Sequence, residues 1–346
     1  MARQNAPRSM VGVWIERDVA APDAAVASDA AAGWSARCVD PAAGWLRLDD
    51  AGVTRGDGVF ETLLYRRGRI RSVGEHLARM ERSGEALALE IPPADVWERA
   101  IALGLEAFLT QDADREADAG NAETRGEETV REEAEPDGEP EASIRCVATR
   151  GAPGAGAACF VTLSPVPARD PDPKPIKVLT LDRGYGSGAA RRAPWLLLGA
   201  KTLSYAVNVA ALTYAKSHGA DDAIFVTSDG LVLDGLTASV VAAYRSREGS
   251  GEGSSEGSGQ ITLRTPGVET GGLAGTTVAA ISEAAKAHGW AVEAVPMRPA
   301  DLLKADALWL ASSVRMLRPV SHVDGTEVSL DPELHEVLSH TLEQTL

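Results

Sequence analysis

Apolar and polar residues follow two periods along this chain, and together they predict a mixed α/β protein. Three-to-four spacing predicts helices over 75–89, 94–109 and 333–346. Alternating or β-branched runs predict strands at 11–15, 45–50, 59–65, 143–151, 158–167, 178–184, 223–227 and 260–265. Glycines at 52, 56 and 58 predict a tight turn between the second and third of these strands.

The first predicted helix shows a clear apolar stripe through Leu77 and Met80. Two interpretations stay open for Arg79, which borders that stripe. Helix spacing alone favours a surface pair with Glu75, one turn earlier. Alternatively, the planar fork of Arg79 reaches inward to a fixed anion. We expect His76 to be a packing residue at the start of the helix rather than a catalytic base.

Two stretches interrupt the alternation and are expected to be inserts. Residues 112–142 hold 13 acidic and 3 basic side chains with few large apolar ones, a composition that predicts a disordered, solubilising loop. Residues 246–259 are rich in Ser and Gly and predict a flexible hairpin tip. The Pro-rich stretch at 168–177 predicts a linker between two domains, 1–167 and 178–346.

The formal net charge of −16 says little about partners, because the acidic insert alone contributes −10 of it. The remainder has no basic patch, so we expect no nucleic-acid partner. No apolar run approaches membrane-spanning length and no signal peptide is evident, so we expect no membrane association. Cys38, Cys146 and Cys159 are widely spaced, which predicts thiols in a reducing cytoplasm, without disulfides and without a metal site.

The stretch around Lys201 carries the candidate chemistry. A predicted helix follows this lysine and ends near Gly219, and a hairpin with its turn at 228–230 then ends at Asp234. The apolar positions of the helix are Leu203, Val207, Ala210, Ala211 and Tyr214. A desolvated lysine with a carboxylate nearby suits Schiff-base chemistry, because burial lowers the pKa of the amine. From this local pattern alone, a solvated surface lysine is the commoner alternative.

A second candidate feature is the start of a predicted helix at Gly275, Thr276 and Thr277. Backbone N–H groups and hydroxyls at a helix N-terminus form a seat for an anion, and phosphate is its natural occupant. Routine N-capping by one of the two threonines explains the same residues equally well.

The motifs gain weight from their order. In sequence they are GDGVFET, EHLARMERSGEAL, TRG, GAK before SYAVN, ADDAIFVTSDGLVLDG, GLAGTT and PVSHVDG. This set resembles the fold-type IV pyridoxal-phosphate enzymes, which include branched-chain aminotransferases, D-amino-acid aminotransferases and 4-amino-4-deoxychorismate lyases. The resemblance spans nearly the whole chain outside the two inserts. It implies two domains, a smaller N-terminal α/β domain and a larger C-terminal pseudo-barrel domain, and it implies a homodimer.

The resemblance also implies roles for individual residues. Lys201 would form a Schiff base with pyridoxal 5′-phosphate and then move protons. The cofactor-binding residues implied by the match are Lys201, Arg79, Asp234, Thr237, Gly275, Thr276 and Thr277. Asp234 and Ser239 depart from the pattern, because the family usually has glutamate and often asparagine there. Aspartate is one methylene shorter, so the strand end shifts inward or a water intervenes, although any carboxylate keeps the ring nitrogen protonated.

Arg145 and Arg150 lie on the strand that reaches the active site in this family, and they would bind carboxylates of the substrate. A surface salt bridge or a contact at a domain interface is the alternative for both arginines.

The reaction is the least determined point. GDGVFET and KTLSYAVNVAALTYA resemble aminodeoxychorismate lyases of the actinobacterial type, and the KAGGNY-like run of branched-chain enzymes is absent. We therefore expect a lyase that releases pyruvate and 4-aminobenzoate for folate synthesis. The alternatives are a D-amino-acid or branched-chain aminotransferase, and a non-catalytic family member that binds cofactor or a partner.

Overall fold

The chain divides into two units, Met1–Arg169 and Asp170–Leu346, each with its own clusters of buried apolar side chains. The computed structural model describes residues 9–17, 33–123, 140–166, 173–246 and 260–344, with only the backbone over 112–123.

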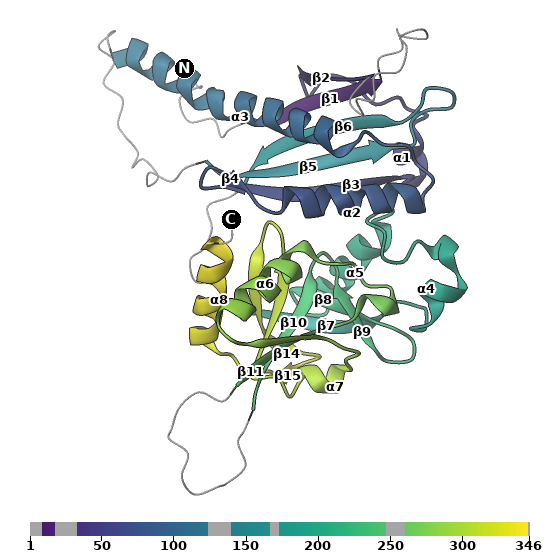
Figure 1. Cartoon of the computed structure of the whole chain (residues 1–346), viewed down its shortest axis with the longest axis vertical. Helices are drawn as coiled ribbons and strands as arrows, with labels where there is room; N and C mark the ends of the chain where they lie inside the picture. The colour runs from purple at the N-terminus through teal and green to yellow at the C-terminus, as the bar shows by residue number, and fades with distance from the viewer. Residues whose placement is uncertain (1–8, 18–32, 124–139, 167–172, 247–259, 345–346) are drawn as a thin grey trace, which may run out of the picture. The chain divides into compact units, whose positions relative to one another are not determined.

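The first unit is built on a six-stranded antiparallel sheet with the order β2-β1-β6-β5-β3-β4 (Figure 1). Its strands are β1 Val11–Arg17, β2 Trp34–Val39, β3 Gly58–Arg66, β4 Arg69–Ile70, β5 Ala142–Thr149 and β6 Ala158–Pro165. The predicted strands at 11–15, 59–65, 143–151 and 158–167 are therefore confirmed. Sequence neighbours β5 and β6 pair as an antiparallel hairpin.

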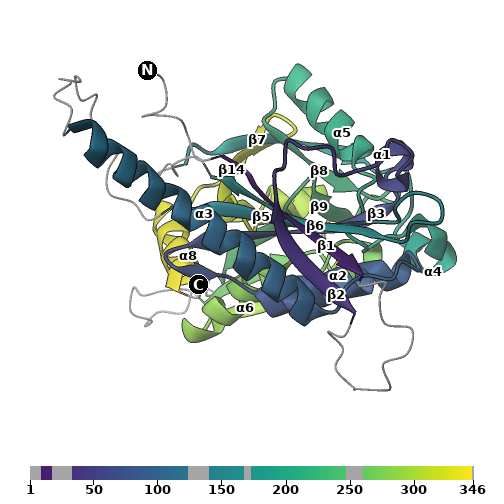
Figure 2. The ribbon, with the colours of Figure 1, turned by 90° about the horizontal axis from the view of Figure 1, so that it is seen from above.

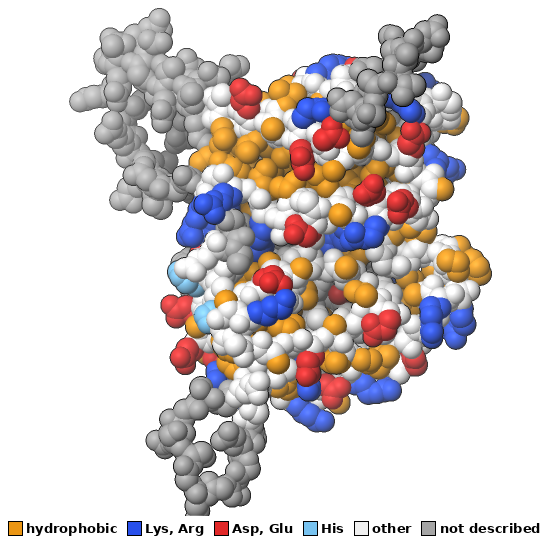
Figure 3. All heavy atoms as spheres, in the orientation of Figure 1, with side chains coloured by type: hydrophobic (Ala, Val, Ile, Leu, Met, Phe, Trp, Pro, Cys, Tyr) orange, Lys and Arg blue, Asp and Glu red, His pale blue; other side chains and the backbone are white. Residues whose placement is uncertain are grey.

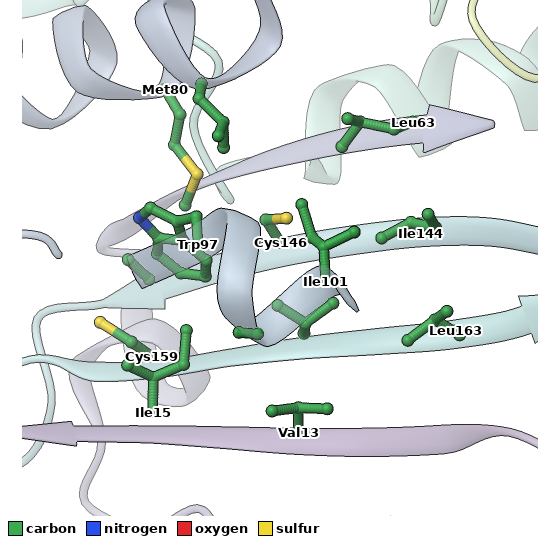
Figure 4. Close-up of a cluster of buried hydrophobic side chains, with 14 of the residues drawn as sticks. Val13, Ile15, Leu63, Met80, Trp97, Ile101, Ile144, Cys146, Cys159 and Leu163 are labelled. Atoms are coloured by element: carbon green, nitrogen blue, oxygen red, sulfur yellow. The ribbon is translucent and has the colours of Figure 1, made fainter. Parts of the chain in front are cut away.

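Two helices cover one face of this sheet (Figure 2). Helix α2, Val73–Ala86, packs on β3, and α3, Ala94–Glu123, packs on β1, β2 and β6. Figure 4 shows Met80 of α2 and Trp97 and Ile101 of α3 among the inward side chains of the strands. Each large apolar side chain buried in this way stabilises the fold by roughly 1.5–3 kcal/mol relative to exposure.

Two sequence predictions are wrong in this unit. The stretch from Trp45 is irregular and leads into a short helix, α1 Ala51–Arg55, rather than forming a strand and a glycine turn. Asp50 explains the difference, because its buried carboxylate accepts the Gly52 amide at 2.7 Å and caps that helix. In addition, α3 continues through the first part of the acidic insert, 112–123. Residues 124–139 lie outside the described part of the chain.

The second unit is built on a mixed nine-stranded sheet. Its order is β12-β11-β10-β13-β14-β7-β8-β9, and β15 pairs with β14. The strands are β7 Ile176–Asp182, β8 Asp222–Val226, β9 Val232–Gly235, β10 Ser239–Arg245, β11 Ile261–Thr265, β12 Ala291–Ala294, β13 Ala307–Ser312, β14 Met316–Val323 and β15 Thr326–Glu327. Strands β9 and β10 stand far apart in that order but contact each other, so the sheet curls back on itself.

The helices of the second unit lie around this curled sheet (Figure 1). They are α4 Ala189–Arg192, η1 Pro194–Leu196, α5 Ala206–Ser217, η2 Val268–Thr270, α6 Thr276–Ala287, α7 Pro299–Leu302 and α8 Pro332–Gln344. The last two residues of the expected linker, 176–177, belong to β7. Residues 168–172 of that linker and 247–259 of the Ser/Gly insert lie outside the described residues.

Helix α5 is confirmed, and only part of its predicted apolar pattern is buried. Ala211 and Ala215 are buried against the sheet, whereas Val207 is 51% exposed and Tyr214 is 50% exposed. Small residues let the helix lie close to β8, so the larger apolar side chains remain on the outside.

The surface charges and the three cysteines bear on the predicted partners and location. Basic and acidic side chains are interspersed on the face drawn in Figure 3. Within the described residues, no helix is both long and apolar enough to cross a membrane. All three cysteines are free thiols, and burial raises the pKa of Cys159 to about 12. The cytoplasmic location inferred from them stays a prediction.

Candidate active site

Lys201 lies in the second unit, on the irregular segment that joins η1 to α5, and it is half-buried. The segment ends where Tyr205 begins α5. The side chain of Asn208, one turn into this helix, donates to the carbonyl of Leu236 at 2.6 Å. This bond ties the start of α5 to the residues that follow β9, the strand that carries Asp234.

Asp234 is half-buried and held by a loop from elsewhere in the unit. Its Oδ2 accepts the backbone N–H of Leu273 at 2.7 Å. Tyr185 is a further neighbour of this carboxylate. Burial raises the pKa of the Tyr185 hydroxyl and the charge of Asp234 adds to the rise, while Arg183, to which Tyr185 is hydrogen-bonded, opposes it.

The N-terminus of α6 meets β10 and the turn after β13. Gly275 is the N-cap, and no side chain caps this helix, so the N-capping interpretation of Thr276 and Thr277 is wrong. A Cβ on Gly275 would lie 2.6 Å from Oγ of Ser239, so only glycine permits this approach. Oγ1 of Thr276 lies 3.4 Å from Oγ of Ser313. Hydroxyls from three elements therefore gather at the start of one helix, as an oxyanion site requires.

Thr237 carries a hydroxyl that is already engaged. Its Oγ1 accepts a hydrogen bond from Nη2 of Arg315, whose Nη1 also lies 3.4 Å from Oδ2 of Asp222. The bond places the guanidinium of Arg315, two residues after Ser313, beside Thr237. The role of Thr237 in phosphate binding stays a prediction.

Arg79 lies in the first unit and is paired with Glu61 of β3, not with Glu75. Its Nε donates to Oε1 of Glu61 at 2.7 Å and its Nη2 donates to Oε2 at 2.9 Å. His76 Nδ1 lies 2.7 Å from the same Oε2. The surface pairing that helix spacing favoured is therefore wrong. Arg79 points inward to a fixed anion, as the alternative interpretation predicted, and that anion is Glu61.

The charge on Glu61 survives full burial because of these partners. The side chain is 0% exposed. Burial alone would raise its pKa, but hydrogen bonds from Arg79 and His76 and the charge of Arg79 lower the pKa of Glu61 to about 2. Whether Arg79 also holds a phosphate stays a prediction.

The two candidate substrate arginines make different contacts within the first unit. Nε of Arg150 donates to Oδ2 of Asp57 at 2.8 Å, and its Nη2 donates to the carbonyl of Leu87 at 2.7 Å. Arg145 lies on β5 with its guanidinium 4.2 Å from the ring centre of Phe60, a cation–π contact. A role in substrate binding stays a prediction for both.

Comparison with known proteins now identifies the family. A family model described as amino-transferase class IV matches residues 58–323, which is more than half of the chain. The chain belongs to this family. The fold prediction of a two-domain fold-type IV enzyme is confirmed, as is pyridoxal 5′-phosphate, the cofactor of the family.

Individual class IV proteins resemble this one over most of their length. A bifunctional aminodeoxychorismate lyase / D-amino acid transaminase of Mycobacterium tuberculosis is 35% identical over 290 residues, which cover 83% of this chain and 89% of that protein. The structure of a fold IV transaminase from Curtobacterium pusillum matches with a TM-score of 0.73 and 33% identity, covering 96% and 99% of the two chains. A PLP-bound hypothetical aminotransferase from Mycobacterium tuberculosis matches with a TM-score of 0.70 and 32% identity, covering 89% and 95%.

Within this class IV enzyme, the residues of the second unit fit the cofactor chemically. A half-buried amine, a carboxylate and a group of hydroxyls at a helix N-terminus match its aldehyde, ring nitrogen and phosphate in turn. Sequence reasoning missed Ser313 and Tyr185. The adjacent serines at 312–313, directly after the apolar strand β13, were the available signal for Ser313. Nothing in the local pattern around Tyr185 pointed to Asp234.

Proposed function

We propose that this chain is a pyridoxal-phosphate-dependent 4-amino-4-deoxychorismate lyase that forms 4-aminobenzoate and pyruvate. The observation that carries the proposal is the 35% identity, over most of both chains, to a relative named for this activity. Lys201, Asp234 and the α6 N-terminus, all in the second unit, support it with a fitting set of groups.

Lys201 is the catalytic residue of the proposal. When bound, the cofactor supplies an aldehyde for the amine and an electron-withdrawing ring that makes the adjacent substrate carbon acidic. Nζ of Lys201 would hold the cofactor and, once released by the substrate amine, would accept the proton of the carbon that bears the substrate nitrogen. Its half-buried position in the second unit supports this role, because the amine is partly screened from solvent.

The other proposed residues bind and orient. The Asp234 carboxylate pairs with the ring nitrogen and keeps it protonated. Gly275, Thr276 and Thr277 hold the phosphate through helix N–H groups and hydroxyls, with Arg79 and Thr237 as further phosphate ligands. Arg150 and Arg145 bind the carboxylates of the substrate. For Arg79 and Arg150 this proposal requires donors beyond those that already bind Glu61 and Asp57.

The lyase step needs no second substrate. Loss of the ring proton and cleavage of the carbon–oxygen bond to the side chain leave an aromatic amine, and the released enolpyruvyl group takes up a proton to give pyruvate. Aromatisation drives the cleavage, so the protein mainly orients the substrate and moves protons.

Product analysis tests the proposal directly. Purified holoenzyme receives aminodeoxychorismate without any keto acid, and pyruvate and 4-aminobenzoate are both measured. We expect equimolar products and their loss in Lys201→Ala. An activity that appears only with a keto-acid acceptor contradicts the lyase proposal, and binding of cofactor without turnover of any amine supports the non-catalytic alternative.

An aminotransferase activity is the second candidate. The same relative is also named as a D-amino acid transaminase, and a related hypothetical aminotransferase was solved with α-ketoglutarate and PMP at 33% identity. Incubation of D-alanine with α-ketoglutarate, followed by assay of pyruvate and glutamate, decides whether this chain has that activity instead of the lyase or in addition to it.

We also propose that the enzyme is a homodimer. The exposed apolar side chains of α5 support this proposal, because exposed Val207 and Tyr214 gain from burial against a second copy.

A further inference from the structure

We propose that the loop at 271–275 is built around an aspartate, so that Leu273 and Gly272 are positioning residues for Asp234. This inference rests on the proposed function, in which the Asp234 carboxylate pairs with the cofactor ring. The family usually has a glutamate at this position, so the shorter side chain requires an explanation in the structure.

The first observation is the hydrogen bond that Leu273 makes to the carboxylate. Its backbone N–H donates to Oδ2 of Asp234 at 2.7 Å, a charge-assisted bond between residues 39 positions apart. A bond to a backbone amide fixes the rotation of the carboxylate, because the amide itself is held by the chain on both sides. The loop therefore decides where the charge of Asp234 points.

The second observation is the close approach of Gly272 to the same oxygen. A Cβ on Gly272 would lie 3.1 Å from Oδ2 and 3.6 Å from Cγ of Asp234. The backbone of the loop thus passes directly against the carboxylate, and it can do so because residue 272 has no side chain. A glutamate would carry its carboxylate about 1.5 Å further along the side chain. That displacement breaks the bond to Leu273 unless the loop moves.

The third observation is that the loop is fixed from its other side. A Cβ on Gly271 would lie 3.0 Å from Cβ of Leu198, three residues before Lys201. The loop therefore packs between the segment that leads to Lys201 and the strand that carries Asp234. Because both neighbours are in contact, the loop cannot retreat from a longer acid without disturbing the lysine segment. The position of the loop suits aspartate specifically.

The test compares Asp234→Glu, Asp234→Asn and Gly272→Ala with the wild-type enzyme. Two quantities are measured: the affinity of the apoprotein for pyridoxal phosphate, and the pH midpoint of the visible band of the bound cofactor. We expect Gly272→Ala to weaken affinity by about tenfold and to shift the midpoint, because the added methyl group crowds the Asp234 carboxylate and displaces it. We expect Asp234→Glu to weaken affinity as well, although it restores the usual family residue.

Controls separate the inference from the proposal beneath it. Gly74→Ala, at a helical glycine with nothing within 4 Å of the added methyl group, should leave both quantities unchanged. Asp234→Asn keeps an acceptor for Leu273 but removes the charge, so it should shift the midpoint. If Asp234→Asn behaves as wild type, the pairing of Asp234 with the ring is wrong and this inference falls with it. If Asp234→Asn shifts the midpoint while Asp234→Glu and Gly272→Ala match wild type, only the role of the loop is overturned.

Discussion

Glu61 shows at the residue scale how a fully buried charge becomes part of a stable core. Both of its oxygens are bonded, to Arg79 and to His76, so the cost of burial is offset by three short contacts. Removing the charge while leaving Arg79 in place should be costly, because the guanidinium then lacks its counter-charge.

We therefore predict that Glu61→Gln lowers the free energy of unfolding by about 3–5 kcal/mol, the usual cost of breaking a buried ion pair. The measurement is the midpoint of urea denaturation. Glu283→Gln is the matched control, because Glu283 also binds a cation, Lys286, but its side chain is 69% exposed. The control should change stability by less than about 0.5 kcal/mol. Equal effects of the two substitutions would show that the Glu61 pair contributes no more than a surface pair.

The pH dependence of stability gives a second prediction for the same residue. The pKa of Glu61 falls from its ordinary 4.5 to about 2 in the folded protein. A carboxylate with a depressed pKa binds fewer protons in the folded state, so its contribution is complete above about pH 4.5 and is lost as pH falls toward 2. Wild type should therefore lose stability between these values faster than Glu61→Gln. Parallel pH profiles of the two proteins would contradict the assignment.

The sequence could not predict which side chains Arg79 and Thr276 contact in the fold. Helix spacing brings Glu75 near Arg79, but a strand residue 18 positions away provides the actual partner. Likewise, Ser313 joins Thr276 only because β13 and α6 meet in the fold. Lys201, Asp234 and Thr276 were proposed from local motifs that occur in a characteristic order, and their roles stay a prediction.

At the element scale, local sequence patterns predicted most strands and helices. They failed where a single side chain or packing contact determined the local structure. Asp50 converted an expected strand into a cap and a short helix. The apolar pattern of α5 did not tell which of its residues are buried: Ala215 packs against the sheet, whereas Tyr214 is exposed. Periodicity reports that a helix has an apolar face but not which neighbour covers it.

The hairpin between β5 and β6 contains two glycines with the same left-handed backbone and different surroundings, since Gly151 is buried and Gly154 is exposed. Gly151 and Gly154 both have positive φ, 75° and 77°. A Cβ on Gly151 would lie 1.8 Å from the carbonyl oxygen of Gly156, whereas nothing lies within 4 Å of one on Gly154. Gly154→Ala should cost about 1–2 kcal/mol, from the left-handed backbone alone.

Gly151→Ala adds a clash with backbone to that same cost, so we expect it to destabilise the protein by several kcal/mol more. Denaturant midpoints of the two variants give the comparison. Because the conformational term is shared, the difference between them measures the close approach. Equal midpoints would mean that the hairpin opens without cost and that Gly156 does not constrain residue 151.

At the scale of the whole molecule, the motifs predicted the class of enzyme, and the curled sheets are those of that class. The motifs did not determine how many copies of the chain assemble. The homodimer was inferred by resemblance and stays a proposal, which the exposed apolar side chains of α5 in the second unit support. The α5 segment AVNVAALTYAKS has one charged residue in 12, which is unusual for a helix whose larger side chains face outward. A second copy presents the same nearly uncharged face, so a two-fold contact brings few like charges together.

Charges placed on this face should therefore separate the subunits. We predict that Val207→Glu combined with Tyr214→Glu raises the dimer dissociation constant by at least about thirtyfold, because two carboxylates would be buried without partners. Light scattering after size exclusion, over a range of concentrations, measures it. Val53→Glu is the control, since Val53 is 57% exposed on α1 of the first unit. A wild-type monomer would contradict the homodimer itself, whereas a dimer that survives both charges would place the interface away from α5.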